Sequence, residues 1–264
     1  MTDDALDPAA LLAVYDAERA RLDAADGMPA EWVGPVLAID FEPVGFVAAP
    51  RDTGLRGAGL DALIAQVRDR FLARGRGVEW KTFAHDEPAD LPELLRAAGF
   101  DPEEPETLLV GASAALAGMS EEVPGVVIRE TADEADFAAI GELESEVWGE
   151  DWSWVADDLR VRAAELGPDG FRVVVAEADG RVVSAAWLVM RPTRSFAGLW
   201  GGSTLAGYRG RGIYRALVAR RARIARDAGY AHLQVDASDM SRPILERLGF
   251  VRLTTTTPYV HPAP

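Results

Sequence analysis

The feature that most limits the fold of this chain is a glycine- and arginine-rich turn between a strand and a helix. Residues 207–212 read Gly-Tyr-Arg-Gly-Arg-Gly, and they connect the apolar stretch 196–205 to the amphipathic stretch 212–228. The spacing of Ile213, Leu217 and Ile224 predicts a helix with one buried face. A strand that turns tightly into a helix is a β–α unit, which favours folds that combine a sheet with helices.

The same turn has the chemistry of an anion-binding site. The first N–H groups of a helix have no partner inside it and carry a partial positive charge. Gly210 and Gly212 let a ligand approach the backbone closely, and Arg209 and Arg211 add positive charge. Seven arginines lie within residues 209–226, and no acidic residue interrupts them. We therefore expect the turn to hold an anionic ligand.

Two common phosphate-binding motifs do not fit this segment. The P-loop pattern GxxxxGK[ST] is absent, and Lys81, the one lysine of the chain, lies far away. The dinucleotide pattern GxGxxG fails because Arg215 occupies its last glycine position. Instead, residues 209–214 resemble the Arg/Gln-x-x-Gly-x-Gly/Ala motif of the GCN5-related N-acetyltransferase (GNAT) family, although Tyr214 stands where Gly or Ala is usual. In that family the loop holds the pyrophosphate of acetyl-CoA.

The resemblance covers residues 123–264 and implies a mixed α/β (α+β) GNAT fold, in which helices flank a mixed central sheet. The predicted order is a strand, two helices, a meander of strands with an Asp179-Gly180 turn, the loop and its helix, a strand, a short helix and a last strand. The family implies acetyl-CoA as cofactor, with its thioester between strands 196–205 and 231–236. The residues expected to contact the cofactor are Gly202, Ser203, Thr204, Leu205, Arg209, Gly210, Arg211, Gly212, Ile213, Tyr214 and Arg215.

The first half of the chain weakly repeats the second. Residues 62–65 match residues 216–219 at an offset of 154, and residues 95–100 match residues 245–250, each closing with Gly-Phe. The predicted elements before residue 111 include a helix at 8–25 but only one strand, at 35–41, ahead of the helix at 59–74.

We therefore expect two domains that are unequal in content. Residues 1–117 would form a degenerate, truncated GNAT-like domain without the early strands and the meander, and residues 123–264 a complete GNAT acetyltransferase domain. The small and polar stretch 111–124 would be a flexible boundary. At the offset of 154, the first copy has Leu55, Gly57 and Ala58 in place of Arg209, Arg211 and Gly212, so it would lack the cofactor loop.

The groups that move protons are left open by the sequence. An amine that attacks the thioester directly, in a ternary complex, must lose a proton to a base or a water chain. The strand 196–205 carries no carboxylate, so Asp236 and Glu146 are the candidate bases, unless they merely cap a turn and face solvent. Many GNAT members have a tyrosine as general acid where this chain has Leu245, which leaves Ser241, Tyr214 or water, although Ser241 also suits a helix cap.

The acceptor is predicted to be a small-molecule or peptide amine, and cationic. Trp148, Trp152 and Trp154 lie among acidic residues between the two helices that cover the acceptor side in GNAT proteins. Indole faces and carboxylates suit a cation. The alternative is that these tryptophans pack the helix pair against the sheet and the acids face solvent.

Charge and composition limit the other classes of function. The chain has 27 basic and 43 acidic residues and a formal charge of −16, although residues 205–264 carry ten basic and four acidic ones. This balance argues against nucleic-acid and anionic-membrane partners. The chain has no cysteine, its three histidines form no metal pattern, and no secretory signal or membrane span is recognised, so a cytoplasmic soluble protein is expected. Its oligomeric state is open. The alternatives are a non-catalytic acyl-CoA sensor or interaction module, and a nucleotide-binding protein unrelated to CoA.

Overall fold

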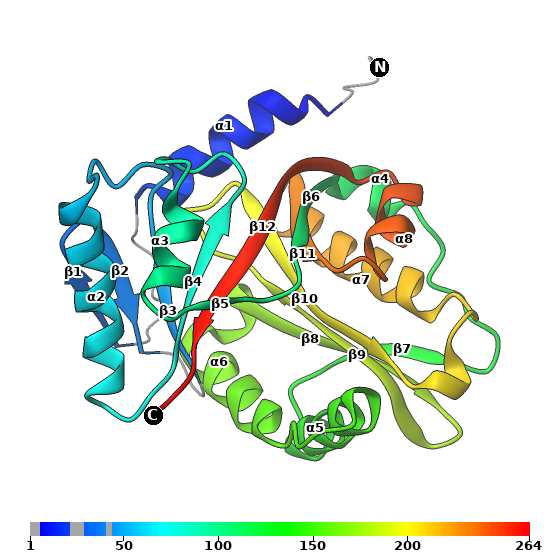
Figure 1. The fold of residues 1–264 in the computed structure, drawn as a ribbon. Coiled ribbons are helices and arrows are strands. Elements are labelled where there is room, and N and C mark those ends of the chain that lie inside the picture. Colours follow the sequence, from blue (N-terminus) through cyan, green and yellow to red (C-terminus); the bar gives the residue numbers. More distant parts are fainter. Residues whose placement is uncertain (1–5, 22–28, 41–43) are drawn as a thin grey trace. The chain divides into compact units, whose positions relative to one another are not determined.

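The structure is a computed structural model that describes residues 6–21, 29–40 and 44–264, and it forms two compact units (Figure 1). The first unit contains the described residues up to Leu109 together with Asp236–Pro243 and Arg252–Pro264, and the second contains Val110–Val235 and Ile244–Val251. Each unit combines a mixed sheet with helices, which confirms the predicted α/β class.

The second unit is built on strands in the order β11-β10-β9-β8-β7, all antiparallel neighbours except β10 and β11, which run parallel. The strands are β7 (Val127–Thr131), β8 (Phe171–Ala178), β9 (Arg181–Val189), β10 (Phe196–Thr204) and β11 (His232–Ala237). The predicted turn between β8 and β9 is confirmed, because Asp179 and Gly180 both have positive φ there.

Three long helices cover the sheet of the second unit. The helices are α5 (Glu134–Trp148), α6 (Trp154–Gly170) and α7 (Ile213–Asp227), with the shorter α4 (Ser113–Ala117) and α8 (Arg242–Arg247). Their buried apolar faces share one core with residues 173–176 of β8, which are buried on both faces of the sheet. Asp133 caps the start of α5 by accepting a hydrogen bond from the Ala135 N–H, and Gly149 ends this helix in the left-handed conformation.

The first unit has strands in the order β1-β2-β3-β4-β12, and β5 pairs with β12. Its strands are β1 (Ala30–Val33), β2 (Val36–Ile39), β3 (Gly45–Ala48), β4 (Val78–Phe83), β5 (Asp101–Pro102) and β12 (Val251–His261). Its helices are α1 (Pro8–Arg19), α2 (Ala58–Leu72) and α3 (Leu91–Ala97). β6 (Glu106–Ala112) begins in this unit and ends in the second.

The expectation that the first half lacks the strand meander is wrong. β1, β2 and β3 form an antiparallel meander, and β3 then pairs in parallel with β4, as β10 does with β11. The sequence indicated only β2, because strands of four residues are too short to show an alternating pattern and β2 is buried throughout. Both halves therefore share the order meander, helix, parallel strand and short helix, which is a tandem arrangement.

The repeat also has a slightly different register from the one read in the sequence. α2 begins at Ala58 and α7 at Ile213, and the residues before them are Gly57 and Gly212. The structural offset at this point is therefore one residue longer than the offset of 154, and Gly57 rather than Ala58 corresponds to Gly212. The predicted domain bounds, 1–117 and 123–264, remain a prediction. The two compact units are defined by contacts between residues and combine separate segments of the chain, so they do not test these bounds.

The stretch expected to be a flexible boundary is instead packed in the second unit. Ser113, Leu116 and Ala117 of α4 are buried, and the Ser113 N–H donates to the Ala231 carbonyl. Arg223 of α7 donates to the carbonyls of residues 117 and 119 and pairs with Glu121. A composition of small residues thus reflects close packing against α7 here, and not mobility.

Candidate functional site

The turn before α7 presents free backbone N–H groups. Gly212 precedes the helix with a φ of 88°, and no side chain caps this end. The Ala216 N–H makes the first helical hydrogen bond, to the Gly212 carbonyl, whereas the N–H groups of residues 213–215 have no partner among the described residues. Gly210 has a φ of 76° and no atom near the position of an added Cβ. The backbone here is therefore open to an anion.

The arginines of the turn are held beside this opening. The Arg209 Nε donates to the Thr204 carbonyl at 2.9 Å, and the Arg211 Nη2 donates to the Pro124 carbonyl at 2.9 Å. Neither guanidinium forms an ion pair with a carboxylate of the described residues, so both positive charges are available to a ligand. The arginines farther along α7 serve other contacts, since Arg220 and Arg223 pair with Glu121. The seven arginines thus do not act together on one ligand.

β10 continues beyond its pairing with β11 before the chain reaches this turn. Their parallel pairing joins residues 196–198 to residues 232–234 and stops there, although β10 continues to Thr204. A β-bulge at Gly202 lies in the part of β10 beyond this pairing, because Gly201 pairs with Ala186 and Ser203 with Ala185. A bulge bends its strand. The last residues of β10 therefore offer backbone groups to an extended ligand.

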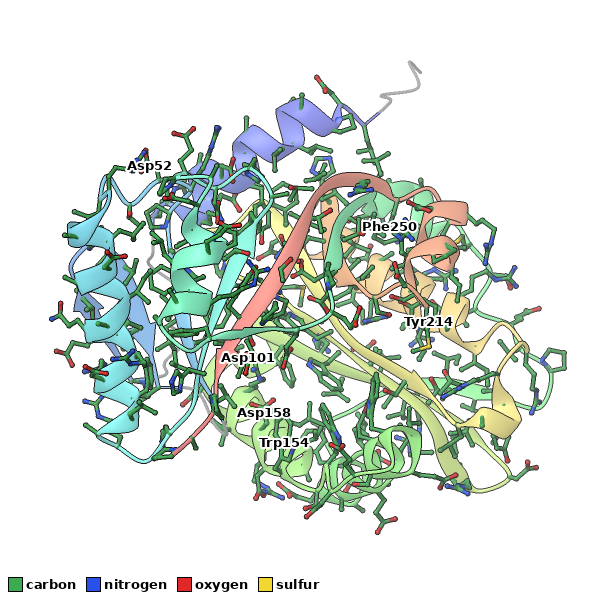
Figure 2. All side chains as sticks on the ribbon, in the orientation of Figure 1. Asp52, Asp101, Trp154, Asp158, Tyr214 and Phe250 are labelled. Atoms are coloured by element: carbon green, nitrogen blue, oxygen red, sulfur yellow. The ribbon has the colours of Figure 1, made fainter. Side chains whose placement is uncertain are left out.

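Two glycines make the bulge possible. Gly201 and Gly202 have φ values of 65° and 103°. A Cβ at Gly202 would lie 2.8 Å from Cε2 of Tyr214, and one at Gly201 would lie 2.6 Å from the ring of Trp187. The ring of Tyr214, labelled in Figure 2, therefore packs directly against the bulged strand, and its burial raises the pKa of the phenol.

Arg221 of α7 supports the same strand from inside the core. It is 1 % exposed, and its Nη1 donates to the carbonyls of Trp187 and Trp200 at 3.2 and 3.1 Å. Burial lowers the pKa of this guanidinium to about 10. A buried arginine thus links β9 to β10 beside the bulge.

The buried carboxylate of the site is Glu144 on α5, which the sequence reasoning missed. The residue is 3 % exposed, and its Oε2 accepts hydrogen bonds from Ser203 Oγ at 2.6 Å and Trp148 Nε1 at 2.9 Å. Burial raises the pKa of Glu144, and these two hydrogen bonds oppose that rise. The spacing along α5 could have indicated that Glu144 is buried. Glu144 follows Ile140 by four residues and Phe137 by seven, and both of these lie on the buried face of the helix.

The three residues predicted to be catalytic lie in other surroundings. Glu146 is exposed and pairs with Arg181 at 3.1 Å. Asp236 accepts from Lys81 Nζ at 3.0 Å and from Thr256 Oγ1 at 3.1 Å, all within the first unit. Ser241, also in the first unit, exchanges hydrogen bonds with Ser238 near the start of α8. Their catalytic roles remain predictions.

The predicted tryptophans form a stack. The ring centroids of Trp148 and Trp152 lie 5.8 Å apart, and those of Trp152 and Trp154 lie 5.3 Å apart. Trp152 and Trp154 pack against the core of the second unit, whereas Trp148 is 51 % exposed. Figure 2 labels Trp154 and Asp158 on α6, where the carboxylate of Asp158 pairs with Arg162. Arg162 also lies over the half-exposed Trp200 of β10, a residue not singled out from the sequence.

Two further features concern the described residues as a whole. No cluster of three or more histidine and acidic side chains in these residues has an arrangement that would hold a metal ion. None of the helices in this part of the chain has both the length and the apolar character needed to cross a membrane.

Known proteins resemble this chain in sequence and in fold. Residues 137–250 match the model of the acetyltransferase (GNAT) family. No curated protein matches the chain. Among solved structures, a GCN5-related N-acetyltransferase from Kribbella flavida is 18% identical with a TM-score of 0.70, covering 97% of this chain and 96% of its own. A tandem GNAT protein from the clavulanic acid biosynthesis pathway is 16% identical with a TM-score of 0.62, covering 87% and 78%.

A third solved structure, a GCN5-related N-acetyltransferase from Sphaerobacter thermophilus, is 16% identical with a TM-score of 0.59, covering 86% of this chain and 76% of its own. At these identities the structures establish the fold, and the family model covers a segment with most of α5, the bulged strand and the turn before α7. Residues 137–250 therefore belong to a GNAT acetyltransferase domain, in a chain that has the GNAT fold in a tandem arrangement.

Proposed function

We propose that the chain is an N-acetyltransferase that transfers the acetyl group of acetyl-CoA to a primary amine of a small molecule or peptide. The observation that carries this proposal is the row of free N–H groups before α7, together with the end of β10 that pairs with β9 but no longer with β11. The N–H groups of residues 213–215 would bind the pyrophosphate, and Arg209 and Arg211 would neutralise it. The backbone of residues 202–205, at the end of β10 and just after it, would pair with the pantetheine arm.

The reaction is a direct acyl transfer in a ternary complex. The amine nitrogen attacks the thioester carbon, an N–C bond forms, and the C–S bond breaks. The attacking nitrogen loses one N–H proton as it becomes an amide, and the sulfur leaves as a thiolate that takes up one proton, so the step balances. Backbone groups near the bulge would polarise the carbonyl, and holding both substrates side by side supplies much of the rate. The amine must first lose a proton.

The cofactor assignment is tested by measuring CoA binding by calorimetry. Gly212→Asp places a carboxylate at the start of α7 and forces a side chain into a backbone with φ of 88°, so CoA binding should be lost. Gly207→Ala is the matched control, because this glycine lies in the same turn and an added Cβ there meets nothing. Equal CoA affinity for G212D and the wild type would overturn the assignment.

The competing proposal is a non-catalytic acyl-CoA sensor, favoured by the apolar, fully buried Leu245 where many GNAT members carry their tyrosine. Thiol release from acetyl-CoA separates the two functions when it is measured with polyamines, aminoglycosides, amino acids, peptides and arylalkylamines. Turnover with any of these amines supports the enzyme, and tight CoA binding without turnover supports the sensor. A cytoplasmic location and the lack of nucleic-acid or membrane partners stay predictions from the sequence.

A further inference from the structure

We infer that Glu144 binds the ammonium group of the acceptor and accepts its proton, and that the acceptor is a primary amine carried on an apolar or aromatic body. This inference rests on the proposed function and deepens it, because it names the base and the class of amine. It is carried by the position of a buried carboxylate between Ser203 and Trp148.

One oxygen of this carboxylate is unsatisfied. Oε2 accepts two hydrogen bonds, whereas Oε1 is buried and has no hydrogen-bond partner among the described residues. No arginine, lysine or histidine of the described residues forms an ion pair with Glu144. A buried acceptor atom without a donor costs free energy, and an unpaired buried charge costs more. A ligand that brings both N–H donors and positive charge would satisfy the site, and a primary ammonium brings both.

The carboxylate is also held where the acyl group would lie. Ser203 belongs to the bulged end of β10, beyond the point where pairing with β11 stops. Its hydroxyl fixes Oε2 of Glu144, so that Oε1 remains for the acceptor. An amine bound to Oε1 would thus lie beside the same strand that is proposed to align the thioester.

The proton transfer is balanced within this pair of groups. The ammonium N–H bond breaks and an O–H bond forms on Oε1, which leaves a neutral amine whose lone pair attacks the thioester carbon. Burial of Glu144 makes its carboxylate a stronger base than an exposed one, while the hydroxyl of Ser203 and the indole N–H of Trp148 are the polar groups that face it from β10 and α5. No charged group from these elements or from α6 pairs with it among the described residues.

Trp148 defines the organic part of the acceptor. Its Nε1 donates to Glu144 while half of its surface stays exposed, and it stacks on Trp152. An apolar or aromatic group attached to the ammonium would cover this indole face, and the positive charge would gain from it. A ligand that carries a carboxylate beside its ammonium group would be repelled by the Glu144 carboxylate. We therefore expect phenethylamine to bind and phenylalanine to bind far more weakly.

The experiment is calorimetric titration of phenethylamine into the CoA-saturated protein. The wild type should bind it, and Glu144→Gln should weaken binding at least tenfold while CoA affinity stays unchanged. Glu142→Gln is the matched control, because it makes the same change at an exposed position of the same helix and should leave binding unaltered. With acetyl-CoA, E144Q should lower kcat by about 10²- to 10⁴-fold, the range typical of a general base.

The pH dependence gives a second readout that needs no variant. Phenethylammonium affinity of the wild type should fall as the pH drops through the raised pKa of Glu144, and E144Q should lack this step. Equal binding and rates for E144Q and the wild type would overturn the inference, as would a wild-type CoA complex that does not bind phenethylamine. Failure of CoA itself to bind would instead overturn the proposed function, so the two failures are distinguishable.

Discussion

Glu144 and Ser203 are joined by a hydrogen bond of 2.6 Å that connects the buried face of α5 to the bulged end of β10. The bond fixes a carboxylate against the part of β10 that continues beyond its parallel pairing with β11. Burial of a charged group is unfavourable unless it is compensated, and only one of the two carboxylate oxygens is satisfied by the described residues. Such a group destabilises the fold, which is typical of functional sites.

The first prediction concerns the pH dependence of stability. The pKa of Glu144 in the folded protein is raised by burial, so the native state holds this proton more tightly than the unfolded chain. The stabilisation of the native state by this tightly held proton is therefore fully present below the ordinary pKa of a glutamate. It is lost as the pH rises through the raised pKa of Glu144. E144Q should gain stability relative to the wild type over this interval. Thermal unfolding of both proteins from pH 4 to pH 8 checks this. Melting temperatures of E144Q and the wild type that change in parallel with pH would contradict a raised pKa of Glu144.

The bulge provides a second prediction. Gly202→Ala places a Cβ 2.8 Å from the Tyr214 ring and forces alanine to a φ of 103°, so the strand or the ring must move. We expect a loss of about 1–3 kcal/mol in stability and at least tenfold weaker CoA binding. Gly207→Ala should change neither, because its backbone and surroundings accept a methyl group. Unaltered CoA affinity in G202A would show that the bulge does not position the cofactor.

A third prediction tests the buried arginine. Arg221→Met removes the donors of the Trp187 and Trp200 carbonyls, and unsatisfied acceptors cost about 1–3 kcal/mol in stability. The exposed Arg226, which pairs with the adjacent Asp227, is the control, and R226M should stay within about 0.5 kcal/mol of the wild type. Urea unfolding measures both. Equal stability of R221M and the wild type would mean that removing an unpaired buried charge stabilises the fold as much as losing the two hydrogen bonds destabilises it.

The sequence predicted the parts of the site that depend on local signals. The strand, the Arg-Gly-Arg-Gly turn and the helix are adjacent in the chain, so spacing and glycine chemistry were enough to place β10 and α7. The Asp179-Gly180 turn was found for the same reason. α4 was missed, because small residues that suit a loop equally suit close packing against α7.

Glu144 could not be chosen from the sequence by its type alone. Acidic residues occupy positions 142, 144 and 146 of α5, and any of them suits a base. Only the helix orientation, set by packing of Phe137 and Ile140 in the core, turns Glu144 inward. Its partner Ser203 lies 59 residues farther along the chain, and contact over that separation depends on the tertiary fold.

The last prediction examines Asp236, the alternative base, through its partner Lys81. Lys81 lies 3.0 Å from Asp236 and 3.5 Å from Glu106, and although burial opposes its charge these carboxylates raise its pKa. Lys81→Met leaves two acids without a cation and should cost about 3 kcal/mol at neutral pH.

The loss in K81M should shrink as the pH falls, because burial raises the pKa of Glu106 and protonation removes the repulsion. Adding Asp236→Asn to K81M should recover stability, since one of the unpaired charges is then gone. Urea unfolding at two pH values measures this coupling, and additive losses would show that Lys81 does not neutralise Asp236. If Asp236 serves this ion pair rather than catalysis, D236N should retain the pH profile of the wild-type rate, in contrast to E144Q.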